Sequence, residues 1–438
     1  MSQARARRRQ ARPRSQSSAG QRLALLLVFV LLFIPSFIFA ALQGWIPAQV
    51  VNAVARVFIW RQEGAVPWTG DQPVNVLILG VQGSSDSTNP LTDSIMVASY
   101  QPQTRSISLL SIPRDLWVEI PGYGEARINE AFQNTGPMGA MLTVQKNLGI
   151  PVNYWAVVSY KAVERLIDDV GGVTVNVPYD IDDPTFPADD GINYDPFRIT
   201  KGVHRLNGRE ALRYARTRHA DSDFGRAERQ QQVLMALKNE LLKPWNWLKA
   251  PILIRDAKNL VKTNFPLDQA PGLMLQILGA GSDSIRRAVL SYENNAVVSY
   301  TGAGGASLLL LNKPVADEII EDLFGPSLAI LRNAPPIQVA NGNGYTGAAT
   351  QFSQVLAGMG ANVLEPTDAD RTNYPTHRVY YRSGDRRTVQ AARLIAAMLG
   401  TTAERGRSDS AIEVILGRNY APFAEFTTED WQKYVPPR

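Results

Sequence analysis

The apolar run VNVLILG at positions 74–80 is the feature of this sequence that most limits its fold. A nearly continuous apolar run that ends in glycine is typical of a strand buried on both faces of its sheet. Two more apolar segments, 94–100 and 105–113, flank a short polar stretch, which predicts a hairpin. Because a strand that is apolar on both faces needs cover on both sides, the sequence predicts an α/β domain in which helices sandwich a mixed β-sheet.

The segments that follow alternate in type, as a layered α/β domain requires. Asn207 is well suited to be the N-cap of one predicted helix. We expect further helices over 244–324 to complete the domain, and a second unit of alternating strands and helices over 335–420. The other predicted helices and strands are helices at 138–149, 161–172, 206–216 and 224–243, and strands at 154–160 and 173–178.

The twenty-residue segment LALLLVFVLLFIPSFIFAAL at 23–42 is apolar and uncharged. As a helix it rises about 30 Å, which matches the hydrocarbon core of a bilayer, so we expect a transmembrane helix with Trp45 as an interfacial anchor. A cleaved signal peptide is the alternative, but the run is longer than a usual signal-peptide core and no clear cleavage site follows it. Residues 1–22 carry seven arginines and no acid, which places this tail in the cytoplasm and the bulk of the chain outside the cell.

Composition excludes several classes of function. The formal net charge of +5 falls to −2 when the seven arginines of residues 1–22 are left out, so the folded part has no general footprint for nucleic acid. The chain has no cysteine, which excludes disulfides, thiolate metal sites and cysteine nucleophiles. Its three histidines are scattered, so acid–base chemistry falls to carboxylates.

We therefore expect six parts along the chain. They are an arginine-rich cytoplasmic tail at 1–22, the transmembrane helix at 23–42, a stalk or linker at 43–73, the main domain at 74–324, a small α/β C-terminal domain at 335–420 and a tail at 421–438.

Charged residues are densest at 216–230, RTRHADSDFGRAERQ, where two predicted helices meet. In extended backbone Arg216 and Arg218 would point the same way, and Arg226 and Gln230 share one face of the next helix. Guanidinium groups bind phosphate oxygens bidentately and stay charged, so these two pairs suit a pyrophosphate. The alternative is a solvated lattice of salt bridges. Its acids would be Asp221, Asp223 and Glu228, and Arg229 is expected to pair with a neighbouring acid on the helix surface.

Six segments resemble successive motifs of the LytR-CpsA-Psr family, in that family's order and behind the single N-terminal membrane helix it usually has. The resemblance covers roughly residues 74–324, and so many ordered motifs do not recur by chance. Residues 335–420 are similar to the smaller C-terminal domain often appended to LytR-type members. The six segments are NVLILGV (75–81), TDSIMVASYQPQTRSISLLSIPRDLWVEIPGYG (92–124), RINEAF (127–132), GGVTVNVP (171–178), GVHRLNGREALRYARTRH (202–219) and SDFGRAERQ (222–230).

The resemblance implies phosphotransfer at the outer face of a bacterial cell membrane. In the family, a glycopolymer carried on a polyprenyl pyrophosphate passes with its proximal phosphate to a sugar hydroxyl of peptidoglycan, and polyprenyl phosphate leaves. An apolar tunnel for the lipid is expected as well. By position, Asp93 in the T-D-[ST] motif would bind Mg²⁺, and Asp223 would orient the arginines or help to remove the acceptor proton. The residues that would clamp the pyrophosphate are Arg114, Arg216, Arg218, Arg226 and Gln230.

Two positions depart from the family's pattern at the expected metal site. Gln82 stands where the family usually has an aspartate, and Leu91 where it often has an arginine. Asp86 in the intervening loop is a candidate replacement ligand. A lipid pyrophosphate hydrolase and a non-catalytic envelope-binding protein with a degenerate metal site stay open as alternatives. A transcriptional regulator is disfavoured, because the sequence has no helix-turn-helix signal and most of the chain is expected outside the cell.

Overall fold

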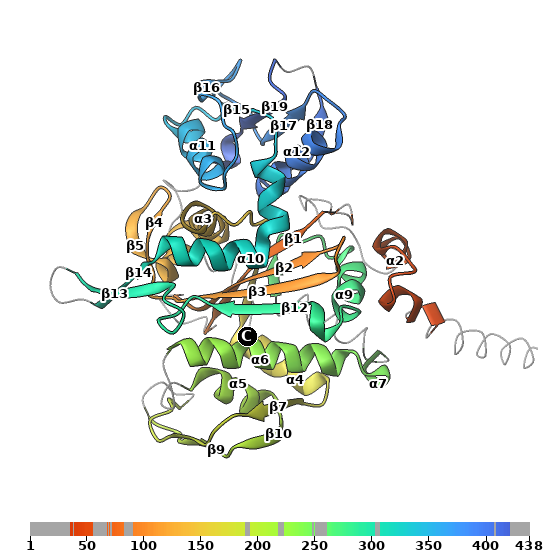
Figure 1. The fold of residues 1–438 in the computed structure, drawn as a ribbon, viewed down its shortest axis with the longest axis vertical. Helices are drawn as coiled ribbons and strands as arrows, with labels where there is room; N and C mark the ends of the chain where they lie inside the picture. Colours follow the sequence, from red (N-terminus) through yellow and green to blue (C-terminus); the bar gives the residue numbers. More distant parts are fainter. Residues whose placement is uncertain are drawn as a thin grey trace, which may run out of the picture.

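The main domain is built on a mixed six-stranded sheet with the strand order β11-β6-β1-β2-β3-β12 (Figure 1). Strand β1 pairs parallel with β6 and antiparallel with β2, and β2 and β3 form the predicted hairpin. The prediction of an α/β fold around a mixed sheet is confirmed. The strands are β1 (Val74–Val81), β2 (Thr92–Gln101), β3 (Ser106–Ile112), β6 (Tyr154–Ser159), β11 (Val261–Thr263) and β12 (Ile285–Val289). The computed structural model describes residues 36–37, 39–55, 68, 70, 72–82, 91–188, 193–217, 223–247, 249, 261–302, 307–406 and 409–420.

Strand β1 is apolar on both faces because helices cover both sides of the sheet (Figure 1). Leu77 and Leu79 belong to a core that α3 and α10 close from one side. Ile78 faces the opposite side, where α4, α5 and α6 lie. This alternation follows from the two-residue period of a strand. The covering helices are α3 (Ala131–Leu148), α4 (Tyr160–Asp169), α5 (Gly208–Arg216), α6 (Asp223–Leu241) and α10 (Lys313–Arg332).

The prediction of helices over 244–324 is wrong for much of that segment. Its described residues contain two strands of the main sheet, β11 and β12, and an antiparallel hairpin of β13 and β14. Strand β12 lies at the sheet edge beside β3, and its sequence IRRAV has two arginines instead of an apolar run. Charged side chains are common on edge strands, so its periodicity did not mark it as a strand. The remaining elements here are α7 (Pro244–Trp247), α9 (Ala270–Leu278), β13 (Val297–Thr301) and β14 (Ser307–Leu311).

Helix α5 begins as the sequence predicts. The Asn207 side chain accepts a hydrogen bond from the backbone N–H of Glu210, and the Glu210 side chain accepts one from the N–H of Asn207. This capping box satisfies donors that a helix start leaves unpaired. Three two-stranded pairs complete the main domain: β4 (Trp117–Ile120) with β5 (Gly124–Arg127), β7 (Val173–Val177) with β10 (Gly202–Leu206), and β8 (Ile181–Asp183) with β9 (Phe197–Ile199).

The C-terminal unit is a small α/β domain, as its sequence predicts. A five-stranded sheet with the order β16-β15-β19-β17-β18 packs against two helices. Helix α10 runs past residue 324 and reaches both cores, with Leu328 in the core of the main domain and Leu331 in that of the C-terminal unit. The elements of the unit are β15 (Ile337–Asn341), α11 (Ala348–Gly358), β16 (Thr367–Asp368), β17 (Arg378–Tyr381), α12 (Arg386–Met398), β18 (Ala403–Arg405) and β19 (Ile412–Leu416).

The predicted transmembrane helix and the two tails lie mostly or wholly outside the described residues. Within the part of the chain that the structure describes, no helix combines the length and apolar character needed to cross a bilayer. Helix α2 (Ala48–Ala55), in the expected stalk, packs against α9, and Oδ1 of Asn52 accepts a hydrogen bond of 2.9 Å from the backbone N–H of Gly272.

Candidate functional site

Asp93 lies at an irregularity in the pairing of β1 with β2. Gly80 lies opposite Ser94 and Val81 opposite Thr92, so Asp93 is an extra residue on β2. A bulge of this kind bends the strand and re-aims a side chain, and bulges are over-represented beside active sites. The close approach of the strands requires glycine at position 80, because a Cβ there would lie 2.9 Å from the Cβ of Ser94.

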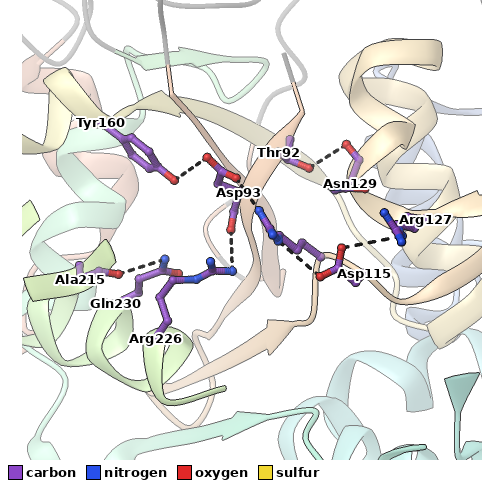
Figure 2. Close-up of polar contacts among 10 residues, drawn as sticks. Thr92, Asp93, Asp115, Arg127, Asn129, Tyr160, Ala215, Arg226 and Gln230 are labelled. Atoms are coloured by element: carbon purple, nitrogen blue, oxygen red, sulfur yellow. Dashed lines mark hydrogen bonds and ion pairs between the residues drawn. The ribbon is translucent and has the colours of Figure 1, made fainter. Parts of the chain in front are cut away.

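Three distant segments of the chain meet at Asp93 (Figure 2). Nη1 of Arg114, which follows β3, lies 3.0 Å from Oδ1 of Asp93. The hydroxyl of Tyr160, at the start of α4, donates to Oδ2 at 3.1 Å. Nη2 of Arg226 on α6 approaches the backbone carbonyl oxygen of Asp93 at 3.5 Å. Asp93 therefore contacts the segment after β3 and the first turn of α4 through its carboxylate, and the first turn of α6 through its backbone carbonyl oxygen.

Arg114 is oriented by acids on two sides. Its Nε lies 3.5 Å from Oδ2 of Asp115, and Oδ1 of Asp115 lies 3.9 Å from Nε of Arg127. The side chains of Arg114 and Asp93 are 22% and 24% exposed, so the pair borders solvent. A guanidinium held in place by carboxylates presents its donors in a defined direction before a ligand binds.

Arg216, the last residue of α5, is placed over aromatic rings. Its guanidinium carbon lies 4.8 Å from the centre of the Tyr160 ring and 5.6 Å from that of Phe186, which is cation–π geometry. Burial raises the pKa of the Tyr160 phenol well above its usual range, and the Asp93 carboxylate adds to that shift. The phenol therefore stays protonated near neutral pH and can donate to Asp93. Tyr160 has no charge and lies outside the family motifs, so no sequence pattern predicted its place in the site.

Replacing Tyr160 with phenylalanine is expected to lower kcat/KM of the proposed reaction about tenfold, because a hydrogen bond to a charged carboxylate is lost while the ring under Arg216 remains. Tyr160→Leu removes the ring as well and is expected to cost more. Steady-state kinetics on both variants measures the two contributions. Equal rates for Tyr160→Phe and the wild type would show that the hydroxyl does not orient Asp93.

Gln230 braces α6 against two other elements. Its Oε1 accepts a hydrogen bond of 2.7 Å from the hydroxyl of Ser94 on β2, and its Nε2 lies 3.5 Å from the carbonyl oxygen of Ala215 on α5. Because Ser94 directly follows Asp93, this amide couples the position of α6 to the bulge. The structure therefore gives Gln230 a positioning contact in addition to its predicted place at the phosphate site.

The expectation that Arg229 lies on the helix surface is wrong. Arg229 is 4% exposed, and its guanidinium donates to the carbonyl oxygens of Tyr214, at 2.9 Å, and of Thr217. The last carbonyls of a helix have no intrahelical donors, so this buried arginine satisfies the end of α5. It thereby fixes the helix end that carries Arg216. The many charged residues beside Arg229 in the sequence predicted that its side chain is exposed, so its role at the end of α5 was not predicted.

Burial of the arginines in the charged segment 216–230 bears on whether it is a phosphate site or a solvated lattice of salt bridges. Arg226 is 6% exposed and Arg229 is also buried, whereas Glu228 is exposed. These two arginines of α6 are therefore not on a solvated surface. Arg218, Asp221 and Asp86 lie outside the described residues, as does the side chain of Asp223, the first residue of α6. The predicted residues that the structure brings to one place are Asp93, Arg114, Arg226 and Gln230, with Arg216 joined to them through Tyr160.

An apolar cavity of about 270 Å³ lies between the sheet and helices α4, α5 and α6. Tyr160 and Arg216 are on its wall. Ser94 and Gln230 line both this cavity and the small pocket that contains Asp93, so the charged site borders the cavity. The apolar lining consists of Ile78, Met96, Val158, Ala162, Val163, Leu166, Leu212, Ala215, Val233, Leu234, Leu237 and Val261.

Asp93 and Asp115 are the carboxylates of the small pocket among the described residues, which contain no cluster of three acidic or histidine side chains suited to a metal. Gln82 directly follows Val81, the partner of Thr92, so it lies at the same end of the sheet. Mg²⁺ commonly takes one or two carboxylates together with phosphate oxygens and water. This donor set fits a cation whose shell a phosphate ligand completes, and the Mg²⁺ assignment stays a prediction.

Comparison with known proteins identifies the family. Residues 53–321 match the LytR_cpsA_psr family. The chain belongs to this family. Residues 334–420 match a second family, described as LytR cell envelope-related transcriptional attenuator. The resemblance recognised from the sequence motifs is thus confirmed for both units.

Relatives of this LytR_cpsA_psr protein carry two kinds of name. Regulatory protein MsrR of Staphylococcus aureus is 34% identical over 261 residues, which are 59% of this chain and 76% of that protein. Polyisoprenyl-teichoic acid–peptidoglycan teichoic acid transferase TagU of Bacillus licheniformis is 32% identical over 211 residues, 48% of this chain and 65% of that protein. The crystal structure of TagV of Bacillus subtilis is similar with a TM-score of 0.50 and 27% identity, covering 58% of this chain and 96% of that one.

Proposed function

We propose that this LytR_cpsA_psr protein is a membrane-anchored phosphotransferase that acts outside the cell. It moves a glycopolymer from a polyprenyl pyrophosphate carrier to peptidoglycan and forms a phosphodiester link. The observation that carries the proposal is the contact between the apolar cavity and the arginine site, through Ser94 and Gln230. A polyprenyl pyrophosphate matches this arrangement, because its long apolar chain suits the cavity and its anionic head suits the arginine site. The transferase names of relatives such as TagU support the choice of reaction.

The proposed reaction exchanges one phosphorus–oxygen bond for another. The acceptor hydroxyl oxygen bonds to the phosphorus that carries the glycopolymer, the bond from that phosphorus to the bridging oxygen breaks, and polyprenyl phosphate leaves with the electron pair. Arg114, Arg216 and Arg226 neutralise charge on the phosphate oxygens, which is the main demand of phosphoryl transfer. Mg²⁺ at Asp93 would add to this neutralisation. Asp223, next to Phe224 on the wall of the small pocket, is the candidate to accept the hydroxyl proton.

A product assay distinguishes this proposal from its alternatives. Purified full-length protein is incubated with a labelled lipid-linked glycopolymer, with and without peptidoglycan strands. Transfer predicts labelled peptidoglycan and polyprenyl phosphate only when both substrates are present. Free glycopolymer phosphate formed at the same rate without peptidoglycan would instead identify a hydrolase, and donor binding without turnover would identify a non-catalytic protein. Because the apolar cavity and charged site are unnecessary for a transcriptional regulator, the name of MsrR does not change the proposal.

Filling the cavity is expected to impair use of the natural lipid donor. Leu234→Trp places a larger ring in the cavity wall, so the KM for a long-chain polyprenyl donor is expected to rise about tenfold, while a water-soluble donor with a methyl group in place of the lipid is affected much less. Met274→Trp on α9, at an exposed residue outside the cavity, is the matched control. Equal effects of Leu234→Trp on both donors would argue against the cavity as the lipid site.

A further inference from the structure

A groove of about 340 Å³ lies on the other side of Asp93 from the apolar cavity. In Figure 2, Tyr160, Ala215 and Gln230 of the cavity wall lie to one side of Asp93, and Asn129 of the groove lies to the other. Three side-chain amides line the groove near the start of α3, from Asn129, Gln133 and Asn134.

The lining of the groove suits a saccharide. Each side-chain amide offers both hydrogen-bond donors and an acceptor, which match the hydroxyl and acetamido groups of sugars. Tyr123, in the turn between β4 and β5, is 52% exposed and supplies a flat apolar ring at the edge of the groove. The groove has the volume of a small ligand site, and its other lining residues are Leu91, Arg127 and Glu130, of which the last two add further polar groups.

Asn129, which lines the groove, has an unpartnered hydrogen-bond acceptor. Its side chain is buried, with the residue 6% exposed, and its Oδ1 has no hydrogen-bond partner among the residues that the structure describes. Its backbone is held in place, since its N–H donates to the carbonyl oxygen of Arg114 and its carbonyl oxygen accepts from the hydroxyl of Thr92, both at 3.2 Å. A buried acceptor without a partner is unfavourable, so this side chain gains a hydrogen bond if it turns toward a donor of a ligand in the groove.

In-line geometry decides which saccharide occupies the groove. In the proposed reaction the leaving polyprenyl phosphate extends toward the apolar cavity, so the attacking oxygen approaches the phosphorus from the opposite side. The glycopolymer stays attached to that phosphorus and extends from it in an equatorial direction. We propose that the groove binds the acceptor, a chain of β-1,4-linked N-acetylhexosamines, and that Asn129, Gln133 and Asn134 position its attacking hydroxyl. This inference rests on the proposed function for the direction of attack.

Binding and kinetics of two variants test the groove. The probe for binding is a β-1,4-linked N-acetylglucosamine tetrasaccharide, titrated into the full-length protein in detergent and followed by calorimetry. Asn129→Leu and the double variant Gln133→Ala/Asn134→Ala are each expected to weaken tetrasaccharide binding about tenfold and to raise the KM for peptidoglycan by a similar factor, with the KM for the lipid-linked donor unchanged. The double variant changes half-buried residues, so it tests the groove even if Asn129→Leu fails to fold.

Gln354→Ala, an exposed glutamine on α11, is the matched control and is expected to leave both KM values unchanged. A raised donor KM with an unchanged acceptor KM would overturn the inference, because it would place the glycopolymer in the groove. Tetrasaccharide binding that is equal in the wild type and the double variant would overturn it too. If the wild type transfers no glycopolymer, the proposed function fails, and the titration still decides whether the groove binds sugar.

Discussion

Asp93→Asn is expected to lower turnover of the lipid-linked donor about a thousandfold and to remove its dependence on Mg²⁺. The amide keeps the shape of the side chain but replaces a full charge with a dipole, so the cation and Arg114 both lose their anionic partner. Because the change is nearly isosteric and Asp93 borders solvent, the fold is expected to persist. Turnover measured over a range of Mg²⁺ concentrations reports the loss of charge at the site, and thermal unfolding reports any loss of stability.

Asp115→Asn is the control for this variant. Asp115 also contacts Arg114, at 3.5 Å, and lines the same small pocket, but the contact of Tyr160 is with Asp93. The control is expected to lose less than about tenfold in rate and to keep its response to Mg²⁺. If Asp93→Asn instead transfers glycopolymer at the wild-type rate with Mg²⁺ present, the metal assignment is wrong and Asp86 becomes the next candidate.

Arg226→Met is expected to reduce turnover by about a thousandfold, the loss typical of removing an arginine that stabilises a transferring phosphate. Arg226 is 6% exposed and reaches the carbonyl oxygen of Asp93, so its charge lies beside the site and is little screened by water. Arg226→Lys keeps the charge but loses the planar fork, and an intermediate rate is expected. Single-turnover kinetics with saturating donor measures the effect on the chemical step.

Arg229→Met provides the contrast, since Arg229 is a buried arginine on the same helix. Removing it leaves the carbonyl oxygens of Tyr214 and Thr217 without its hydrogen bonds, so the free energy of unfolding is expected to fall by about 3 kcal/mol. Arg226→Met is expected to lose rate out of proportion to any loss of stability. A rate for Arg226→Met that recovers fully at low temperature would mean that unfolding, not missing charge, caused the loss.

Local patterns in the sequence determined the architecture of the main domain. The apolar run of β1 predicted a sheet covered on both faces, because a strand exposes alternate residues to opposite sides. Asn207 predicted the start of α5, because a helix start needs an acceptor within three residues of its first free N–H groups. The ordered motifs predicted that Asp93, Arg114, Arg226 and Gln230 share a site, and the structure places them together.

Local sequence patterns did not predict other features of the structure. Strand β12 lacks an apolar run because it lies at the edge of the sheet and carries arginines. The sequence predicted Arg229 as a surface residue, because the burial of one side chain depends on the elements that pack over it. Its hydrogen bonds to the carbonyl oxygens of Tyr214 and Thr217 leave no sequence signal, since any residue supplies a backbone carbonyl. The cavity and the groove are bounded by side chains from many elements, so no window of sequence contains either one.

The sequence by itself determined the fold class, the family and most of the charged residues of the site, because periodicity, capping and motif order are properties of short stretches of chain. Only the tertiary structure decided how those residues are held. The structure decided the bulge that presents Asp93, the hydrogen bond from Tyr160 to its carboxylate and the placement of the Gln230 amide between β2 and α5. The Tyr160–Asp93 and Ser94–Gln230 contacts join residues 67 and 136 positions apart. Contacts at such separations depend on how whole elements pack, and packing is set by the complete core.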